Sequence, residues 1–198
     1  MRVTAETKAA TRQKILDTAR RLFADNGFQA TTTRDIAVAA GIATGTLFNY
    51  FQTKEAIIAC LVSEAGSDAV AQFQVSRQES ESLVEDLFAL VVTGMRKLKS
   101  LRMHLPSLLA TSLSPLASGT SGETVAFRVD HLEAVASLAK VRDCGEMPPV
   151  ALQLYWTLYT GILVFWANDQ SPKQEDTLAL ADHSLNMFVS WLSDHAKT

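Results

Sequence analysis

The 198-residue sequence is poor in cysteine and proline, with two cysteines, Cys60 and Cys144, and five prolines. Two distant cysteines cannot form the disulfide framework of a small secreted domain, and they are too few for a zinc site. The first residues, MRVTAETKAATRQK, contain no apolar stretch of the kind that a secretory signal requires. We therefore expect a soluble protein of the reducing cytoplasm.

The sequence also lacks the motifs that mark common enzymes. It has no His-Glu-x-x-His pair, no Gly-x-Ser-x-Gly elbow and no glycine-rich phosphate loop. Its four histidines are scattered, and Cys60 lies among apolar residues, as is typical of a buried, unreactive thiol. An enzyme is therefore the disfavoured alternative, and we expect no catalytic residue, no metal site and no cofactor.

Long hydrophobic runs are scarce, and the clearest one spans residues 150–167. Its length approaches that of a membrane span. However, no Lys or Arg flanks it closely, and its aromatic residues are scattered along it and do not gather at its ends. We expect a helix that packs between its own core and a partner, and we expect no membrane contact.

Charge is distributed unevenly along the chain. Residues 1–54 carry eight Lys or Arg and four acidic residues, whereas residues 55–198 carry ten and seventeen. A basic N-terminal segment on an acidic body predicts that only this segment meets a polyanion such as nucleic acid. A small excess of charge is a weak signal, so the prediction depends on the motifs.

Almost every segment has the periodicity of a helix. Apolar residues recur at helical spacing from Ala9 to Asp25 and in longer stretches after residue 82, and no segment has the pattern of a strand. Gly27 and Gly41 are typical of helix ends, and Thr33 stands at the N-cap position of a short helix over residues 34–40. We therefore expect an all-α fold of about nine helices.

Residues 33–51 have the plan of a helix-turn-helix, with a short helix, a tight turn at Gly41 and a second short helix. Thr, Phe and Asn side chains on the outward face of the second helix suit a major groove, where threonine methyls and rings meet thymine methyls and asparagine reads adenine. A three-helix bundle with a polar surface is the alternative, but it does not explain an exposed Phe48.

Four motifs occur in order within roughly residues 8–62, namely ILDTARRLFADNGF, TTTRDIAVAAGI, GTLFNYF and TKEAI. This segment resembles the DNA-binding domain of the TetR family of bacterial transcriptional repressors. The rest of the chain resembles the family only in plan. The resemblance implies a helix-turn-helix DNA-binding domain in residues 1–53 and a ligand-binding and dimerisation domain in residues 54–198.

The resemblance also implies DNA-binding roles. Family members hold phosphates with the first residue of the second helix and with two residues after the recognition helix, and they touch bases from the recognition helix itself. The expected DNA-binding residues are Thr33, Arg34, Thr44, Gly45, Thr46, Phe48, Asn49, Tyr50 and Lys54.

Three recognition-helix residues depart from the family pattern. Ala43 stands where serine is common, so the usual N-cap is missing, and Thr44 is an alternative cap. Thr44 and Phe48 replace the common Lys and Tyr, so we expect the operator to be read through thymine methyls and shape. The departures leave open a helical ligand-binding or scaffolding module that no longer binds DNA.

The resemblance implies a small-molecule site in the body. Trp156, Tyr159 and Leu163 share one helical stripe, and we expect a mostly hydrophobic effector, aromatic or acyl. An ordinary packed core is the alternative for any one of these residues. The expected ligand-binding residues are Met103, Phe127, His131, Trp156, Tyr159 and Leu163.

The resemblance finally implies a homodimer that pairs its last two helices across a two-fold axis. The expected dimerisation residues are Leu152, Tyr155, Phe165, Trp166, Leu178, Leu185, Phe188 and Leu192. The implied function is that of a repressor that binds a palindromic operator and is released by its effector.

Overall fold

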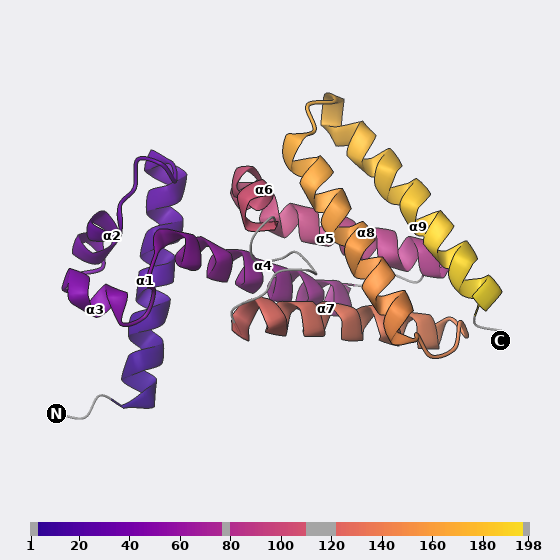
Figure 1. Cartoon of the computed structure of the whole chain (residues 1–198), viewed down its shortest axis with the longest axis horizontal. Coiled ribbons are helices and arrows are strands. Elements are labelled where there is room, and N and C mark those ends of the chain that lie inside the picture. The colour runs from indigo at the N-terminus through magenta and orange to yellow at the C-terminus, as the bar shows by residue number, and fades with distance from the viewer. Residues whose placement is uncertain (1–3, 77–79, 110–121, 196–198) are drawn as a thin grey trace. The chain divides into compact units, whose positions relative to one another are not determined.

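The computed structural model describes residues 4–76, 80–109 and 122–195, and these residues form helices without a strand. The described residues contain nine α-helices and two 3-10 helices, so the predicted all-α fold is confirmed (Figure 1). The elements are α1 Ala5–Asn26, α2 Thr33–Ala39, α3 Thr44–Phe48, α4 Lys54–Ser76, α5 Leu83–Leu98, η1 Lys99–His104, α6 Leu105–Leu108, α7 Gly122–Val141, α8 Pro149–Asn168, η3 Pro172–Gln174 and α9 Glu175–His195.

The chain divides into two compact units inside α4. The N-terminal unit ends at Leu61, and the C-terminal unit begins at Val62. The expected domain boundary, between residues 53 and 54, is the start of α4. The first turns of α4 belong to the N-terminal unit and bury Ile57 and Ile58 in its core.

The N-terminal unit is a small helical domain in which α2 packs against both α1 and α3. Its core contains Ile15 of α1, Ile36 of α2 and Leu47 of α3, each fully buried. Thr4 caps α1 by accepting a hydrogen bond from the main chain of Thr7. Helical spacing placed these apolar side chains on one face of each helix, so their burial holds the three helices together.

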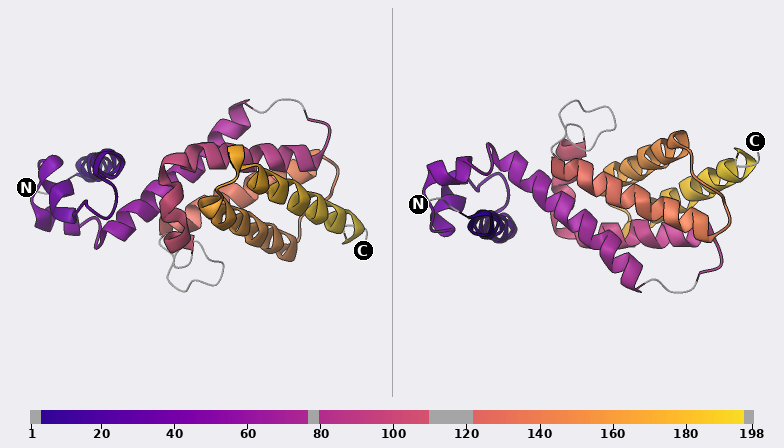
Figure 2. Two further views of the ribbon diagram at one scale, coloured as in Figure 1. Left: turned by 90° about the horizontal axis from the view of Figure 1, so that it is seen from above. Right: turned by 90° about the horizontal axis from the view of Figure 1, so that it is seen from below.

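In the C-terminal unit, α5 packs against α7 and α9, and α8 also packs against α7 and α9 (Figure 2). The largest buried side chains of this unit are mostly aromatic and come mostly from α8. They are Tyr155, Trp156, Tyr159 and Trp166 of α8, Phe127 of α7 and Phe188 of α9.

A close approach sets the spacing between α4 and α7 in the C-terminal unit. A Cβ atom at Gly66 would lie 2.4 Å from Cε2 of Phe127, whose ring is 1% exposed. Beside this contact, the Ser67 hydroxyl donates a hydrogen bond of 3.1 Å to the Asp130 carboxylate. The missing side chain at residue 66 therefore lets the two helices meet with only a ring between them.

A buried carboxylate joins the start of α5 to the residue that follows α7. Arg142 Nε donates a hydrogen bond of 2.8 Å to Oδ2 of Asp86, and the Ser80 hydroxyl donates to Oδ1 at 2.6 Å. The Asp86 side chain is 1% exposed, whereas that of Arg142 is 22% exposed. The hydrogen bond to Asp86 raises the pKa of the Arg142 guanidinium above its ordinary value.

Two helices are long and apolar enough to cross a membrane by length and composition alone, Lys54–Ser76 and Pro149–Asn168. The second contains the hydrophobic run noted in the sequence. Buried residues make up 56% and 44% of their most apolar windows. Core helices of soluble proteins pass the same test, so this evidence for a membrane span is weak.

Candidate functional site

The start of α2 is held by a reciprocal pair of hydrogen bonds. The Thr32 hydroxyl accepts from the main-chain N–H of Asp35 at 3.1 Å, and the Asp35 carboxylate accepts from the main-chain N–H of Thr32 at 2.9 Å. This is a capping box. Hydrogen bonds from the Thr32 side chain and main chain lower the pKa of Asp35.

The expected N-cap, Thr33, is therefore wrong by one residue. Asp35 stands three residues after Thr32, which is the spacing at which a carboxylate reaches back to the N-cap. Thr33 is instead the first residue of α2 and is half-buried, while its neighbour Arg34 is exposed.

The helix α3 follows a turn at Gly41, whose φ of +65° lies in the left-handed region that favours glycine. Its N-cap is Ala43, which makes no side-chain hydrogen bond. Thr44 does not replace the missing cap, because it already lies inside the helix. The helix ends at Phe48, but turn hydrogen bonds of 2.9–3.0 Å from Tyr50 and Phe51 to the Leu47 carbonyl continue the coil to residue 51.

The outward face of α3 contains the residues that the sequence placed there. Phe48 is 39% exposed, Gly45 and Asn49 are exposed, and Thr44 and Thr46 are half-buried. Tyr50 is also half-buried. Beneath this face, Leu47 and Phe51 are 0% and 5% exposed. The buried pair anchors α3, so the face above it is presented to solvent on a fixed support.

Lys54 has a different environment from the one expected of a phosphate contact. Its Nζ donates to the carbonyl oxygens of Phe28, Gln29 and Thr31 at 2.9, 3.4 and 3.2 Å. It also lies 4.4 Å from the centroid of the Phe28 ring. The ammonium therefore holds the segment between α1 and α2 in place, and its hydrogen-bonding capacity is used within the protein.

Four of the six expected ligand-binding residues come together in the C-terminal unit. The His131 ring stacks on Tyr159 with centroids 4.3 Å apart, and Trp156 lies edge-on to both Phe127 and His131 at 5.8 and 5.9 Å. We call Phe127, His131, Tyr155, Trp156 and Tyr159 the aromatic cluster. Each of its members is at most 2% exposed.

The two other expected ligand-binding residues lie outside the cluster. Leu163 is buried one helical turn beyond Tyr159 on α8. Met103 is 76% exposed in η1, so the expectation that it forms an opposite wall is corrected. A 3-10 segment follows α5 there and turns this side chain to solvent, which the α-helical periodicity did not predict.

The aromatic cluster also contains buried polar groups. His131 Nε2 and the Tyr155 hydroxyl lie 3.1 Å apart in hydrogen-bond contact. Burial lowers the pKa of His131 to about 3, so its ring is neutral at pH 7. Among the described residues, two buried polar atoms have no hydrogen-bond partner, Nε1 of Trp156 and Oγ of Ser63.

Five of the eight expected dimerisation residues are buried within the chain itself. Tyr155, Trp166, Leu185, Phe188 and Leu192 are each at most 1% exposed. A side chain enclosed by its own chain cannot contact a second copy, so these five are corrected to core residues. Heptad spacing identified the apolar residues of α9 but did not show which face they occupy.

Several apolar residues of α8 and α9 are exposed, and we call six of these positions the α8–α9 face. Leu152 and Leu178 of the expected set are half-buried, and Phe165 is 44% exposed. The sequence did not single out the other members. The α8–α9 face consists of Leu154, Gly161, Val164, Phe165, Leu180 and Met187.

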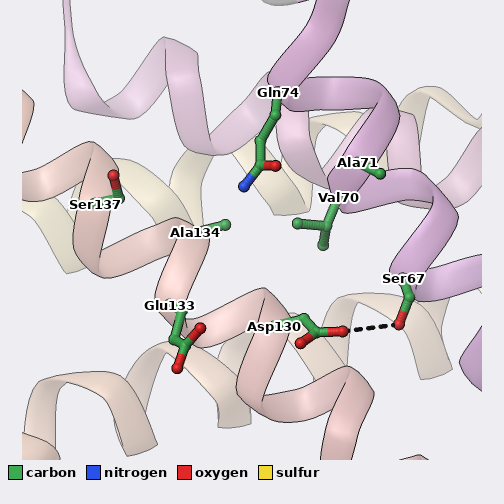
Figure 3. A pocket seen from close by; sticks show the side chains of 8 residues that line it. All are labelled: Ser67, Val70, Ala71, Gln74, Asp130, Glu133, Ala134 and Ser137. Carbon is green, nitrogen blue, oxygen red and sulfur yellow. Dashed lines mark hydrogen bonds between the residues drawn. The ribbon is translucent and has the colours of Figure 1, made fainter.

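Grooves elsewhere in the C-terminal unit do not involve the expected ligand-binding residues. A groove of about 310 Å³ between α4 and α7 has the carboxylates of Asp130 and Glu133 and the amide of Gln74 on its walls (Figure 3). A larger groove of about 640 Å³ lies between the end of α4 and α5. Neither is lined by a member of the aromatic cluster.

Comparison with known proteins identifies the N-terminal unit. The sequence model described as "Bacterial regulatory proteins, tetR family" matches residues 15–61, which include α2, α3 and the start of α4. The N-terminal unit therefore belongs to the TetR family. This family consists of transcriptional regulators and not of enzymes.

Relatives of this TetR-family chain match it to different extents. The HTH-type transcriptional repressor KstR2 of Rhodococcus jostii is 49% identical over 51 residues, which are 26% of this chain and 25% of KstR2. The HTH-type transcriptional repressor Rv1474c of Mycobacterium tuberculosis is 27% identical over 180 residues, which are 87% of this chain and 91% of the relative.

A solved structure extends the likeness to the whole fold of this TetR-family chain. Thermus thermophilus FadR, a TetR-family transcriptional repressor solved in complex with lauroyl-CoA, superposes with a TM-score of 0.67. The match is 23% identical and covers 89% of this chain and 92% of FadR. The helical C-terminal unit therefore has the fold of the corresponding part of FadR.

Proposed function

We propose that this TetR-family regulator is a repressor that binds a palindromic DNA operator as a homodimer. A small, mostly hydrophobic effector releases it. The protein acts in the cytoplasm, where operator DNA is accessible. The observation that carries the proposal is the outward face of α3, where an exposed Phe48 and Asn49 stand above the buried Leu47 and Phe51.

The chemistry of the α3 face supports reading of bases in a major groove. Asn49 offers the paired donor and acceptor that match adenine, and Phe48 and the threonine methyls offer apolar contacts to thymine methyls. Thr33, Arg34 and Tyr50 are the proposed contacts to phosphates. Lys54 contributes indirectly, by holding the segment between α1 and α2.

The α8–α9 face supports the homodimer. Single exposed apolar residues are normal, but here six exposed positions without charge lie on two helices that pack against each other. Gly161 is exposed in the middle of α8, and no atom lies within 4 Å of where its Cβ would be. Glycine inside a helix costs about 1 kcal/mol of stability relative to alanine. Close packing of a helix from a second copy against Gly161 would offset this cost.

The aromatic cluster supports the effector site. A buried indole N–H without a partner costs about 1–3 kcal/mol, and a polar group of a ligand would satisfy it. The neutral His131 and the Tyr159 ring beside it add oriented polar groups to apolar walls, which is the composition of ligand pockets. Because FadR was solved with lauroyl-CoA, we propose a fatty acyl compound as the first effector class to test.

The proposed release mechanism follows from the geometry of DNA. A dimer has to present its two recognition helices about 34–36 Å apart to enter successive major grooves. An effector that binds better to a different spacing lowers operator affinity by its differential affinity, typically about 1–3 kcal/mol.

The DNA-binding part is tested by selecting bound duplexes from a random double-stranded pool at two salt concentrations. We expect an inverted repeat to be enriched. Asn49→Ala should then relax the preference at one base pair in each half-site, whereas Gln29→Ala, an exposed change in the same unit, should leave it unaltered. Failure to enrich any sequence, with folded protein, would favour a module that no longer binds DNA.

The dimer is tested by analytical ultracentrifugation. Met187→Glu places a charge on the α8–α9 face, where Met187 is 72% exposed, and should shift the protein toward monomer. Val141→Glu is the matched control, because Val141 is 61% exposed on α7. If the wild type, Met187→Glu and Val141→Glu sediment alike, the α8–α9 face is not the dimer interface.

A further inference from the structure

A groove of about 290 Å³ lies in the C-terminal unit where α5 and η1 meet the connection between α8 and α9. Three basic residues line it, Arg96 and Lys99 from one side and Lys173 of η3 from the other. The sequence did not group them, because Lys173 lies far along the chain from Arg96 and Lys99. We call these residues and the space between them the basic groove.

Within the described residues, the three cations of the basic groove have no hydrogen-bond or ion-pair partner. All three side chains are exposed. By contrast, Arg102, Arg128 and Arg142 of the same unit donate hydrogen bonds to main-chain or side-chain oxygens. The basic groove therefore gathers three cations that no acidic side chain of the described residues pairs with.

The positive charge of the basic groove contrasts with the net negative charge of the C-terminal unit. Residues 62–198, which form this unit, carry sixteen acidic and ten basic residues, so a random patch of this surface would be acidic. No acidic residue lines the basic groove. Like charges repel, so three of them facing one space raise the energy of the empty groove and favour an anion there.

The floor of the basic groove is apolar and firmly held. It is formed by Met95, Trp166 and Leu178, of which Trp166 is 1% exposed. The Trp166 indole N–H donates to Oε1 of Gln174 at 2.7 Å, and Arg102 lies 5.4 Å from its ring centroid. A ligand that bound here would meet an apolar surface that includes Trp166 on one side and exposed cationic side chains on the other.

From this combination we propose that the basic groove binds a small phosphate monoester with a short apolar substituent. The arginine fork and two ammonium groups match the two negative charges and several oxygens of a phosphate, and a carboxylate would use them less fully. The apolar substituent rests on the floor. The volume is at the lower limit of ligand pockets, so the substituent is short.

This site is separate from the aromatic cluster. Trp166 follows Trp156 by ten residues on α8, which corresponds to about 15 Å along the helix axis. No member of the aromatic cluster lines the basic groove, and no member of the α8–α9 face does so. The site is therefore independent of both the proposed effector site and the proposed dimer.

The test is calorimetric titration of the full-length protein with hexyl phosphate, beside 1-hexanol, heptanoate and inorganic phosphate. We expect saturable binding of hexyl phosphate that weakens as salt is raised, at least fivefold weaker binding of heptanoate, and no binding of hexanol or inorganic phosphate at the same concentrations. Comparable binding of hexanol would overturn the proposal, because the cations would then be irrelevant.

Variants locate the binding. Arg96→Gln, Lys99→Gln and Lys173→Gln should each weaken hexyl phosphate binding by about fivefold to tenfold, and the triple variant should abolish it. Lys97→Gln is the matched control, since Lys97 is an exposed neighbour on α5 that does not line the groove. Binding that persists in the triple variant, or an equal loss in Lys97→Gln, would contradict the proposal.

Discussion

The two units of the chain differ in where they keep their polar chemistry. In the N-terminal unit the polar groups with proposed functions are exposed or half-buried, and the ion pair between Arg20 and Asp17 has side chains 48% and 57% exposed. In the C-terminal unit, Asp86 and His131 are at most 2% exposed. A surface group is free to meet a ligand, whereas a buried group also determines whether the unit folds.

The largest test of this difference compares one ion pair from each unit. Arg142→Gln leaves the buried Asp86 carboxylate without its cation, and we expect a loss of about 3 kcal/mol in the free energy of unfolding. Arg20→Gln breaks an exposed pair and should cost less than about 1 kcal/mol. Urea unfolding measures both, and equal losses would mean that burial is not the determining factor.

The second test uses pH and the buried histidine. Unfolding returns His131 from a pKa of about 3 to its ordinary 6.5, so below pH 6.5 only the unfolded chain takes up the proton. Its contribution to stability is complete above pH 6.5 and is lost as the pH falls toward 3. Between pH 7 and pH 5 this loss amounts to about 2 kcal/mol.

The His131→Phe variant isolates this contribution. Between pH 7 and pH 5, the wild type should lose about 2 kcal/mol more of its free energy of unfolding than the variant does. His183→Gln, an exposed change on α9, should follow the wild type. Parallel curves for His131→Phe and the wild type would show that His131 takes up its proton over the same pH range in the folded and the unfolded protein.

The third test concerns the exception in the N-terminal unit, where Lys54 uses its charge inside the protein. Lys54→Met removes donors from three carbonyl oxygens and should cost about 1.5 kcal/mol. Hydrogen exchange of the main-chain amides of residues 28–36 should rise, while Lys8→Met, an exposed change on α1, leaves them protected. If the amides of residues 28–36 remain protected from exchange in Lys54→Met, Lys54 does not hold this segment, and it is again a candidate phosphate contact.

The smallest expected effects on stability are those of substitutions at the adjacent residues Thr32 and Thr33. Thr32→Ala removes the N-cap of α2 and should cost about 1 kcal/mol, with little direct effect on DNA. Thr33→Ala should leave stability within about 0.5 kcal/mol and weaken operator binding, if Thr33 contacts a phosphate. Thermal unfolding and a mobility shift on the selected operator distinguish them, and the reverse pattern would exchange the two roles.

The contrast between the units also explains what the sequence predicted. Residues 33–51 form a local motif, so short-range spacing was enough to place Phe48 outward and Leu47 inward. The N-cap was misplaced by one residue because three consecutive threonines offer the same hydroxyl, and only the reach of the Asp35 carboxylate selects Thr32.

Contacts between distant segments were harder to predict. Spacing could not bring Lys54 to the carbonyls of residues 28–31, because that contact depends on how α1 and α4 pack. Apolar residues surround α8 on every side, so its periodicity did not distinguish the buried Tyr155 and Trp166 from the exposed Phe165. Met103 was misplaced because a 3-10 segment changes the direction of its side chain.

The contact between Gly66 and Phe127 constrains the order in which this protein can evolve. A side chain at position 66 would overlap the Phe127 ring, so a substitution there requires that ring to move or to be replaced. Phe127 also lies against Trp156 and His131. A lineage that replaces Phe127 with a smaller residue therefore makes substitutions at position 66 possible. Once a side chain occupies position 66, a return to phenylalanine at position 127 becomes unfavourable.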